Sequence, residues 1–163
     1  MLQLFIHPYN WYNMEKDDYK IIFYHSDEEE HQTDFSFLTE RLFEESPIPC
    51  EHKLTFKKET EFGGREDFRF QMNFDGLDYY EFQDTLPKEQ QEQMDDLFYI
   101  IGHKIGGYAY FTQSDPREYN NKAKNDILLL QIDSQEKIMF GDVGAPHLQI
   151  IFSKDISSHE TRL

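Results

Sequence analysis

The chain has 163 residues, of which 16% are aromatic, with 15 Phe and 10 Tyr. This length and composition predict one folded domain over residues 1–163, with a core built largely of aromatic rings. Acidic residues outnumber basic ones, and residues 1–100 hold 24 Asp and Glu against 9 Lys and Arg, a net charge of −15 out of −16. This acidic part repels nucleic acid at long range and attracts basic protein surfaces. The simpler alternative is that the charge serves solubility alone.

Membrane, metal and redox classes find little support in the sequence. No apolar run approaches the roughly 20 residues that a membrane-spanning helix needs, and no signal-peptide pattern begins the chain, so we expect a cytoplasmic protein. Cys50 is the single cysteine, and its neighbour Glu51 disfavours a thiolate. The histidines lack zinc-site spacing, and we expect no metal and no cofactor. Asp126, Asp133 and Asp142 could meet a hard cation, although solvated turn aspartates are the commoner outcome.

The first half of the chain predicts a hairpin, a helix and a strand. Residues 2–6 and 19–24 are β-rich and predict a hairpin over residues 1–25 with a long loop. Helical spacing predicts a short helix from about residue 34 to 45, capped by Thr33 or Asp34. Alternating polarity predicts a strand over 53–62, ended by a turn at Gly63 and Gly64.

The second half predicts a second helix and further strands. The aromatic stretch 68–86 suggests a strand with a turn at Asp75 and Gly76. A helix is expected over 88–101, with Pro87 in its first turn and Gly102 at its C′ position. Three more strands are expected at 126–132, 137–140 and 148–152. The predicted fold class is α+β, an antiparallel β-sheet with an N-terminal β-hairpin and two helices.

The N-terminal hairpin carries residues suited to acting on RNA. A register with Ile6 or His7 against Tyr24 or His25 would bring two imidazoles together. Those imidazoles, or one of them with Lys20, could supply the base and acid for transesterification of RNA by its own 2′-hydroxyl. The loop offers side chains that can stack on and hydrogen-bond to unpaired bases, namely Tyr9, Asn10, Trp11 and Tyr12. The alternative is that the loop aromatics cover the core and the histidines are strand-end polar residues.

Residues 102–117, GHKIGGYAYFTQSDPR, form the most particular motif in the chain. The motif lacks the GKS or GKT ending of a phosphate-binding loop and follows a helix instead of opening one, so we do not expect nucleotide binding. The structural interpretation is that Gly106 and Gly107 permit a tight passage under the sheet, with Asp115 and Pro116 in a turn.

This motif, with DILLLQIDS from Asp126 and MFGDVG from Met139, resembles the YwqG-like family of bacterial proteins. The resemblance implies the family fold in its later portion, without the N-terminal segment of longer members. Ala109 and Phe140 depart from the family's usual proline and tryptophan. The family motif falls on His103, Gly106, Gly107, Thr112, Gln113, Asp115 and Arg117.

Small acidic proteins with truncated YwqG-like folds look like anti-CRISPR proteins. The resemblance therefore implies an inhibitor whose partners are a type II CRISPR effector nuclease and its guide RNA, acting by promoting guide RNA truncation through the hairpin. Whether the protein cleaves RNA itself, activates its partner or only blocks it is left open. The alternative function is a cytoplasmic binding or toxin-immunity protein that uses the GGYAYFTQSDPR surface. Self-association through an exposed edge of the first hairpin is a further expectation.

Overall fold

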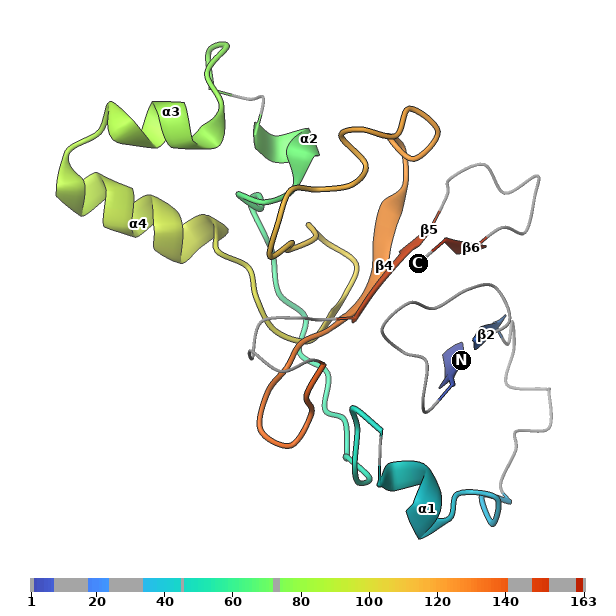
Figure 1. Cartoon of the computed structure of the whole chain (residues 1–163). Coiled ribbons are helices and arrows are strands. Elements are labelled where there is room, and N and C mark those ends of the chain that lie inside the picture. The colour runs from blue at the N-terminus through green and yellow to red at the C-terminus, as the bar shows by residue number, and fades with distance from the viewer. Residues whose placement is uncertain are drawn as a thin grey trace.

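The computed structural model describes residues 2–7, 18–23, 34–44, 46–71, 74–140, 148–152 and 161–162. Strands β1 (Leu2–Ile6) and β2 (Tyr19–Phe23) form an antiparallel two-stranded sheet. A second antiparallel sheet has the order β3-β4-β5-β6, with bounds Lys104–Ile105, Ile127–Ile132, Leu148–Phe152 and Thr161–Arg162. Four helices belong to the described part, namely α1 (Glu40–Phe43), α2 (Phe68–Gln71), α3 (Tyr79–Asp84) and α4 (Lys88–Phe98). The predicted α+β class and the N-terminal hairpin are confirmed (Figure 1).

The hairpin register places four apolar residues on one face. Leu4 lies opposite Ile21 and Ile6 opposite Tyr19, and the His7 N–H donates to the carbonyl of Asp18 at 2.7 Å. A strand alternates its side chains between two faces, so this register gathers four apolar side chains on the same side. The register predicted to join the two imidazoles is therefore wrong, because Ile6 pairs with Tyr19 and not with Tyr24.

Helix α1 is shorter than the predicted helix 34–45. The chain turns first, since the Ser36 N–H donates to Asp34 Oδ1 at 2.9 Å and the Leu38 N–H donates to the carbonyl of Phe35 at 2.9 Å. Asp34 thus caps a local turn instead of the helix, which is a common alternative for this side chain.

Helix α4 confirms the second predicted helix but ends before Gly102. Its C-cap is Tyr99, whose φ of −85° and ψ of 85° leave the helical region. The ring of Tyr99 lies against the guanidinium of Arg65, with 4.2 Å from Arg65 Cζ to the ring centroid. Gly102 has a φ of +100°, and its N–H donates to Asp133 Oδ2 at 2.8 Å. The prediction of Gly102 as the C′ residue is wrong, because it turns the chain toward β4 instead.

Three predicted strands are absent from the described residues. The segment 53–62 has no regular structure, and 137–140 makes only an isolated bridge between Gln135 and Ile138. The stretch 68–86 forms α2 and α3, although its predicted turn at Asp75 and Gly76 is confirmed by the Phe74–Leu77 bridge. Strands β4 and β5 confirm the predictions at 126–132 and 148–152.

The core consists of aromatic rings packed between short helices. Phe70, Tyr79 and Met94 are buried and form one cluster, extended by the partly buried Phe74, Phe82, Leu86, Phe98 and Tyr108. A second cluster joins Ala109, Phe111 and Leu128 under β4. The rings of the first cluster meet in edge and tilted contacts, such as Phe70 with Phe98 at 4.7 Å between centroids, and Phe74 stacks on Phe82. The predicted ring-built core is present, but the rings sit on helices where a strand was expected.

Gly63 and Gly64 allow close packing against the aromatic cluster, and a turn begins at Gly64. Both glycines are buried, and neither has a positive φ. A Cβ at Gly63 would overlap the Phe70 ring, and one at Gly64 would lie 2.7 Å from Tyr108 Cβ. The predicted turn is present at Gly64, whose carbonyl accepts the Asp67 N–H at 2.9 Å, and the missing side chains also let 63–64 pass against the aromatic cluster. Among the described residues, no helix has the length and apolar character needed to cross a membrane.

Candidate functional site

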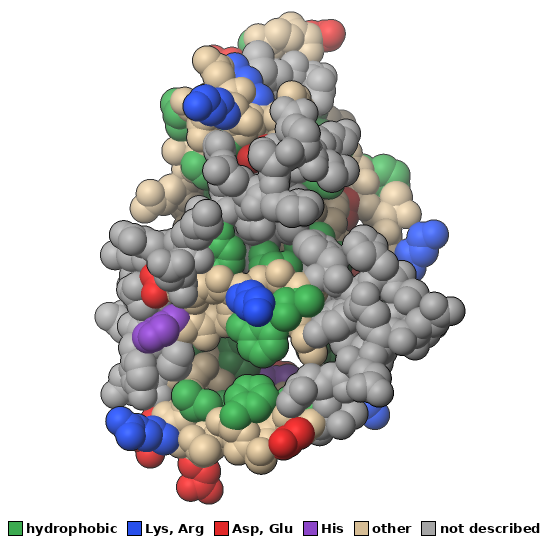
Figure 2. Space-filling view, turned by 90° about the vertical axis from the view of Figure 1, so that its right-hand side faces the viewer, with side chains coloured by type: hydrophobic (Ala, Val, Ile, Leu, Met, Phe, Trp, Pro, Cys, Tyr) green, Lys and Arg blue, Asp and Glu red, His purple; other side chains and the backbone are tan. Residues whose placement is uncertain are grey.

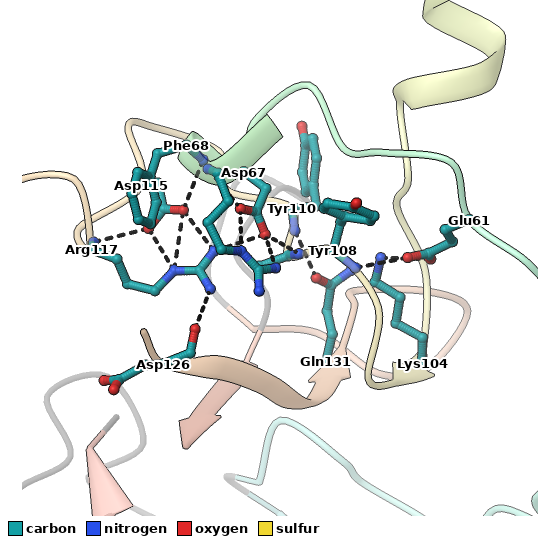
Figure 3. Close-up of polar contacts among 12 residues, drawn as sticks. Glu61, Asp67, Phe68, Lys104, Tyr108, Tyr110, Asp115, Arg117, Asp126 and Gln131 are labelled. Carbon is teal, nitrogen blue, oxygen red and sulfur yellow. Dashed lines mark hydrogen bonds and ion pairs between the residues drawn. The ribbon is translucent and has the colours of Figure 1, made fainter. Parts of the chain in front are cut away.

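The centre of the family motif is a buried ion network around Arg117, which is only 1% exposed (Figure 3). Arg117 Nε donates to Asp115 Oδ1 at 3.0 Å, and Nη2 donates to Asp115 Oδ2 at 2.7 Å and to Asp67 Oδ2 at 2.9 Å. Nη1 donates to the carbonyl of Asp126 at 2.9 Å. The rings of Phe68 and Phe111 flank the guanidinium, each 5.5 Å from Cζ. Each guanidinium nitrogen therefore has a partner, as buried charge requires.

Two Asp-X-Arg sequences make this network. In each of them the carboxylate accepts the backbone N–H of its own arginine, Arg69 to Asp67 Oδ1 at 3.1 Å and Arg117 to Asp115 Oδ1 at 2.9 Å. Arg69 also donates from Nε to Asp67 Oδ1 at 2.8 Å. The two turns interlock, because Arg117 crosses to Asp67 while the Phe68 N–H donates to Asp115 Oδ2 at 3.2 Å. Two carboxylates and two guanidinium groups leave the cluster with no net charge.

Burial and charge act in opposite directions on Asp67. Burial alone would raise the pKa of this carboxyl, but the hydrogen bonds from Arg69 and the charge of Arg117 hold the pKa below its usual value of 3.8. On Arg117, burial opposes the charged form, while Asp115 and Asp67 raise the pKa above its ordinary value. Both side chains remain charged at neutral pH, and the network works as a structural clamp.

A second anchor holds the two glycines of the motif. Glu61 accepts from Lys104 Nζ at 2.8 Å with Oε1, and from the Tyr108 N–H at 2.8 Å with Oε2. Gly107 has a φ of +81°, and a Cβ there would overlap Glu61 Oε2. Burial lowers the pKa of Lys104 even though Glu61 opposes the shift. The tight passage predicted at Gly106 and Gly107 is found at Gly107, where the Glu61 carboxylate approaches the backbone, whereas a Cβ at Gly106 would meet nothing within 4 Å.

Gln131, which the sequence did not single out, and Asp133, which it suggested only as a cation ligand, join the motif to β4. The fully buried Gln131 accepts the Tyr110 N–H at 3.0 Å and donates to the carbonyl of Gly102 at 3.0 Å. Beside it, the Asp133 N–H donates to His103 Nδ1 at 3.1 Å. Each of these contacts satisfies a polar group near residues 102–110 that forms no strand hydrogen bond.

A tyrosine pair ties the motif to helix α4. The hydroxyls of Tyr99 and Tyr110 lie 3.2 Å apart, and Arg65, which stacks on Tyr99, donates to Asp95 Oδ1 at 2.6 Å. The hydroxyl of Tyr79 donates to the same Asp95 oxygen at 3.3 Å, and burial together with Asp95 raises the pKa of Tyr79 to about 12. The acidic helix pair α3–α4 is thereby fixed to the motif by side-chain contacts.

These anchors present an exposed tip, Thr112 to Ser114, between the buried Phe111 and Asp115. Within the described residues, the side chains of Thr112 and Gln113 make no hydrogen bond to the protein. The turn that follows has Pro116 at its second position, and the Glu118 N–H donates to the carbonyl of Asp115 at 3.1 Å, which confirms the turn predicted there. The motif therefore combines a clamped base with a polar tip that can bind a ligand or partner.

The hairpin brings two of its three predicted catalytic residues to one face. Phe5 lies opposite Lys20, and His7 is two residues beyond Phe5 on the same strand, so the side chains of His7 and Lys20 share a face as diagonal neighbours. Both side chains are exposed. Figure 2 views the molecule from the right-hand side of Figure 1, where hydrophobic side chains lie with basic and histidine side chains among them. The predicted residues Tyr9, Asn10, Trp11, Tyr12 and His25 lie outside the described residues.

The aspartates considered for a cation are not brought together. Asp133 uses both carboxylate oxygens, accepting the N–H of Gly102 and that of Ser134 at 2.8 Å each. Asp126 is buried, and its Oδ1 has no hydrogen-bond partner; its carboxylate points away from Arg117 in Figure 3. Asp142 lies outside the described part. Among the described residues, no three acidic, histidine or cysteine side chains form a metal-binding group.

The structural clamp was visible in the sequence only as a repeated spacing. Asp67-Phe68-Arg69 and Asp115-Pro116-Arg117 share the Asp-X-Arg pattern, and the first of them lies inside an aromatic run. Sequence reasoning selected the second through the family motif and missed the first. The charged residue inside an aromatic run was the available signal, since a charge there needs a partner.

Comparison with known protein families matches nearly the whole chain to one family. A family profile described as "Domain of unknown function (DUF1963)" matches residues 1–159, nearly the full sequence. The chain belongs to the DUF1963 family. DUF1963 lies in the YwqG-like family, so the resemblance drawn from the GGY and DPR residues is confirmed at the level of family. No curated protein matches this chain, and the DUF1963 description carries no activity.

Proposed function

We propose that this protein inhibits a type II RNA-guided nuclease by binding the nuclease–guide RNA complex, and that its hairpin promotes shortening of the guide RNA. The observation that carries the proposal is the hairpin β1–β2. It forms a sheet of its own, none of its described side chains is buried, and Phe5, His7 and Lys20 share one exposed face. Such a face offers an aromatic ring, an imidazole and an ammonium group to an RNA strand.

The acidic surface supports a basic protein partner. Helices α3 and α4 and their connection expose Asp78, Glu81, Asp84, Glu89, Glu92 and Asp96. Lys88 is the single basic residue in 78–98. RNA-guided nucleases hold their guide heteroduplex in a positively charged channel, which an acidic surface complements. In Figure 1 the helix pair and the hairpin lie at opposite sides of the molecule, so an extended partner could contact both.

The chemistry proposed for the hairpin needs no metal. An RNA 2′-hydroxyl attacks the adjacent phosphorus and loses its proton to the His7 imidazole. The bond from phosphorus to the 5′-oxygen breaks, the 5′-oxygen takes a proton from an acid, and the products are a 2′,3′-cyclic phosphate and a 5′-hydroxyl. Lys20 would stabilise the phosphorane charge or supply that proton. His25, the third residue predicted from the sequence, remains a prediction for the same step.

A denaturing gel of labelled guide RNA tests this function. The RNA is incubated with this protein alone, with the nuclease alone and with both. We expect a shortened RNA only when both proteins are present. His7→Ala and Lys20→Ala should each abolish the shortening, whereas Lys124→Ala, which removes an exposed lysine in a turn outside the hairpin, should not. Intact guide RNA together with normal cleavage of the target would contradict the proposal.

The exposed tip of the family motif favours a second candidate, a cytoplasmic binding or toxin-immunity protein. The side chains of Thr112 and Gln113 are exposed on a base held by the buried Arg117 network, which suits recognition of a partner by a rigid loop. Thr112→Ala with Gln113→Ala separates the two candidates. If these changes abolish inhibition of the nuclease while His7→Ala leaves it intact, the hairpin mechanism is wrong and the tip is the functional surface.

A further inference from the structure

Residues 53–62, KLTFKKETEF, lie as an extended exposed segment between α1 and α2 (Figure 1). Leu54 is 70% exposed, Phe56 77% and Phe62 69%. Lys57 Nζ donates to Glu59 Oε1 at 2.6 Å, which places these two side chains on the same face at a separation of two residues, as in a strand. The segment thus has the alternation of a β-strand, with its apolar side chains in solvent.

The backbone of this segment is unpaired within the described residues. No backbone N–H or carbonyl of residues 53–60 takes part in a hydrogen bond with another described residue. Glu61 fixes the end of the segment through Lys104 and the Tyr108 N–H. An ordered, extended backbone with free hydrogen-bonding groups and exposed apolar side chains is a template for adding another strand.

We propose that this segment pairs antiparallel with the same segment of a second copy of the chain, across a two-fold axis at Lys58. The sequence is self-complementary in this register. Leu54 lies opposite Phe62 of the second copy, and Lys57 lies opposite Glu59 of the second copy. Each contact occurs twice, as the symmetry of an isologous dimer requires.

The contacts of Glu61 select this register over its neighbour. Shifting the axis to residue 59 would pair Lys57 with Glu61 of the second copy, but Glu61 already holds Lys104 and Tyr108. It would also place two Glu59 carboxylates opposite one another, which is destabilising. With the axis at Lys58, two lysines meet, and their long flexible stems can turn the ammonium groups into solvent.

Charge-swap variants in sedimentation equilibrium test the pairing. The unaltered chain is expected to dimerise as its concentration rises. Lys57→Glu and Glu59→Lys each create two like-charge pairs across the axis and should weaken dimerisation at least severalfold. An equimolar mixture of the two single variants should form a heterodimer, because one variant is then acidic and the other basic at both positions, so both contacts are attractive. Lys124→Glu is the matched control for the change in net charge and should leave dimerisation unaltered.

Disulfide trapping tests the register directly. Lys58→Cys in a Cys50→Ser background should form a covalent dimer on oxidation, because residues facing each other at the axis have Cα atoms about 5 Å apart. Thr60→Cys in the same background should not, since each Thr60 faces Phe56 of the second copy. Circular dichroism confirms that the variants fold. A chain that stays monomeric at every concentration, or single charge variants that dimerise like the unaltered protein, would overturn the proposal.

Discussion

At the scale of residues, the most demanding position is Arg117. The guanidinium uses its planar fork on Asp115 while reaching Asp67 and the Asp126 carbonyl, contacts that a single ammonium group could not make together. The clamp explains how the carboxylates of Asp67 and Asp115 can stay buried in a chain with so much negative charge. Both are paired with arginines in its interior, so their charge is compensated locally.

Replacing Arg117 with Lys keeps the charge and removes the fork. We expect the free energy of unfolding to fall by at least about 2 kcal/mol, because charge-assisted hydrogen bonds to two carboxylates are lost in a buried site. Urea denaturation measures the change. Arg41→Lys in α1, where the side chain is exposed, is the matched control and should change stability by less than about 0.5 kcal/mol. Equal effects of the two substitutions would contradict the clamp.

Asp67 offers a test through pH. Its folded pKa lies below the 3.8 of the free carboxyl, because the arginine contacts outweigh burial. Because the folded pKa is lowered, the ionised carboxylate stabilises the folded state. This stabilisation is fully present above pH 3.8 and is lost as the pH falls through the folded pKa. An NMR titration of the Asp67 carboxyl carbon should therefore give a midpoint below 3.8. A midpoint above that value would mean that burial dominates and that the arginine contacts are weak.

At the scale of elements, the sequence pattern predicted those helices and strands whose formation depends on their own residues. β1, β2, β4, β5 and α4 follow from alternation or helical spacing in their own residues. The strand expected over 68–86 failed because Phe70, Phe74 and Tyr79 pack on one another from α2, the turn and α3, and the tertiary packing of large rings outweighs β-propensity. The helix expected from residue 34 shortened because Asp34 formed a side-chain turn. The clamp joins residues 50 positions apart, and no local pattern contains that contact.

Alanine substitutions at two adjacent glycines distinguish the cost of backbone strain from the cost of side-chain crowding. Gly106 and Gly107 have φ values of +74° and +81°, but a Cβ meets nothing within 4 Å at Gly106 and meets Glu61 at Gly107. Gly106→Ala should cost about 1 kcal/mol from the left-handed backbone alone. Gly107→Ala should cost at least about 2 kcal/mol, because Glu61 must also leave Lys104 and the Tyr108 N–H. Thermal and urea unfolding measure both, and equal costs would mean that Glu61 does not hold the turn.

At the scale of the whole molecule, the acidic helix pair α3–α4 and the hairpin are two separate parts. The acidic helix pair is linked to the motif through Asp95, Arg65, Tyr99 and Tyr110, while the hairpin forms a separate sheet. An interface that uses both would combine electrostatic attraction at one side with contacts to RNA at the other. Attraction of this kind should weaken as salt rises.

Neutralising part of the helix pair tests the electrostatic contribution. Glu89→Gln with Glu92→Gln should slow association with the nuclease severalfold at low salt and reduce the salt dependence. Glu118→Gln with Glu136→Gln removes the same charge from exposed positions in the nearly neutral part of the chain and is the matched control. If both pairs of changes affect the association rate equally, the acidic helix pair is not the docking surface.

The central claim is that the protein recognises a nuclease together with its guide RNA. The most direct measurement is the binding of labelled protein to the nuclease–guide complex, to the nuclease without guide and to free guide RNA, by surface plasmon resonance at several salt concentrations. We expect tight, salt-sensitive binding to the complex and none to free RNA. Absence of binding to the nuclease in either form at low salt would contradict the account and direct attention to the Thr112–Ser114 tip.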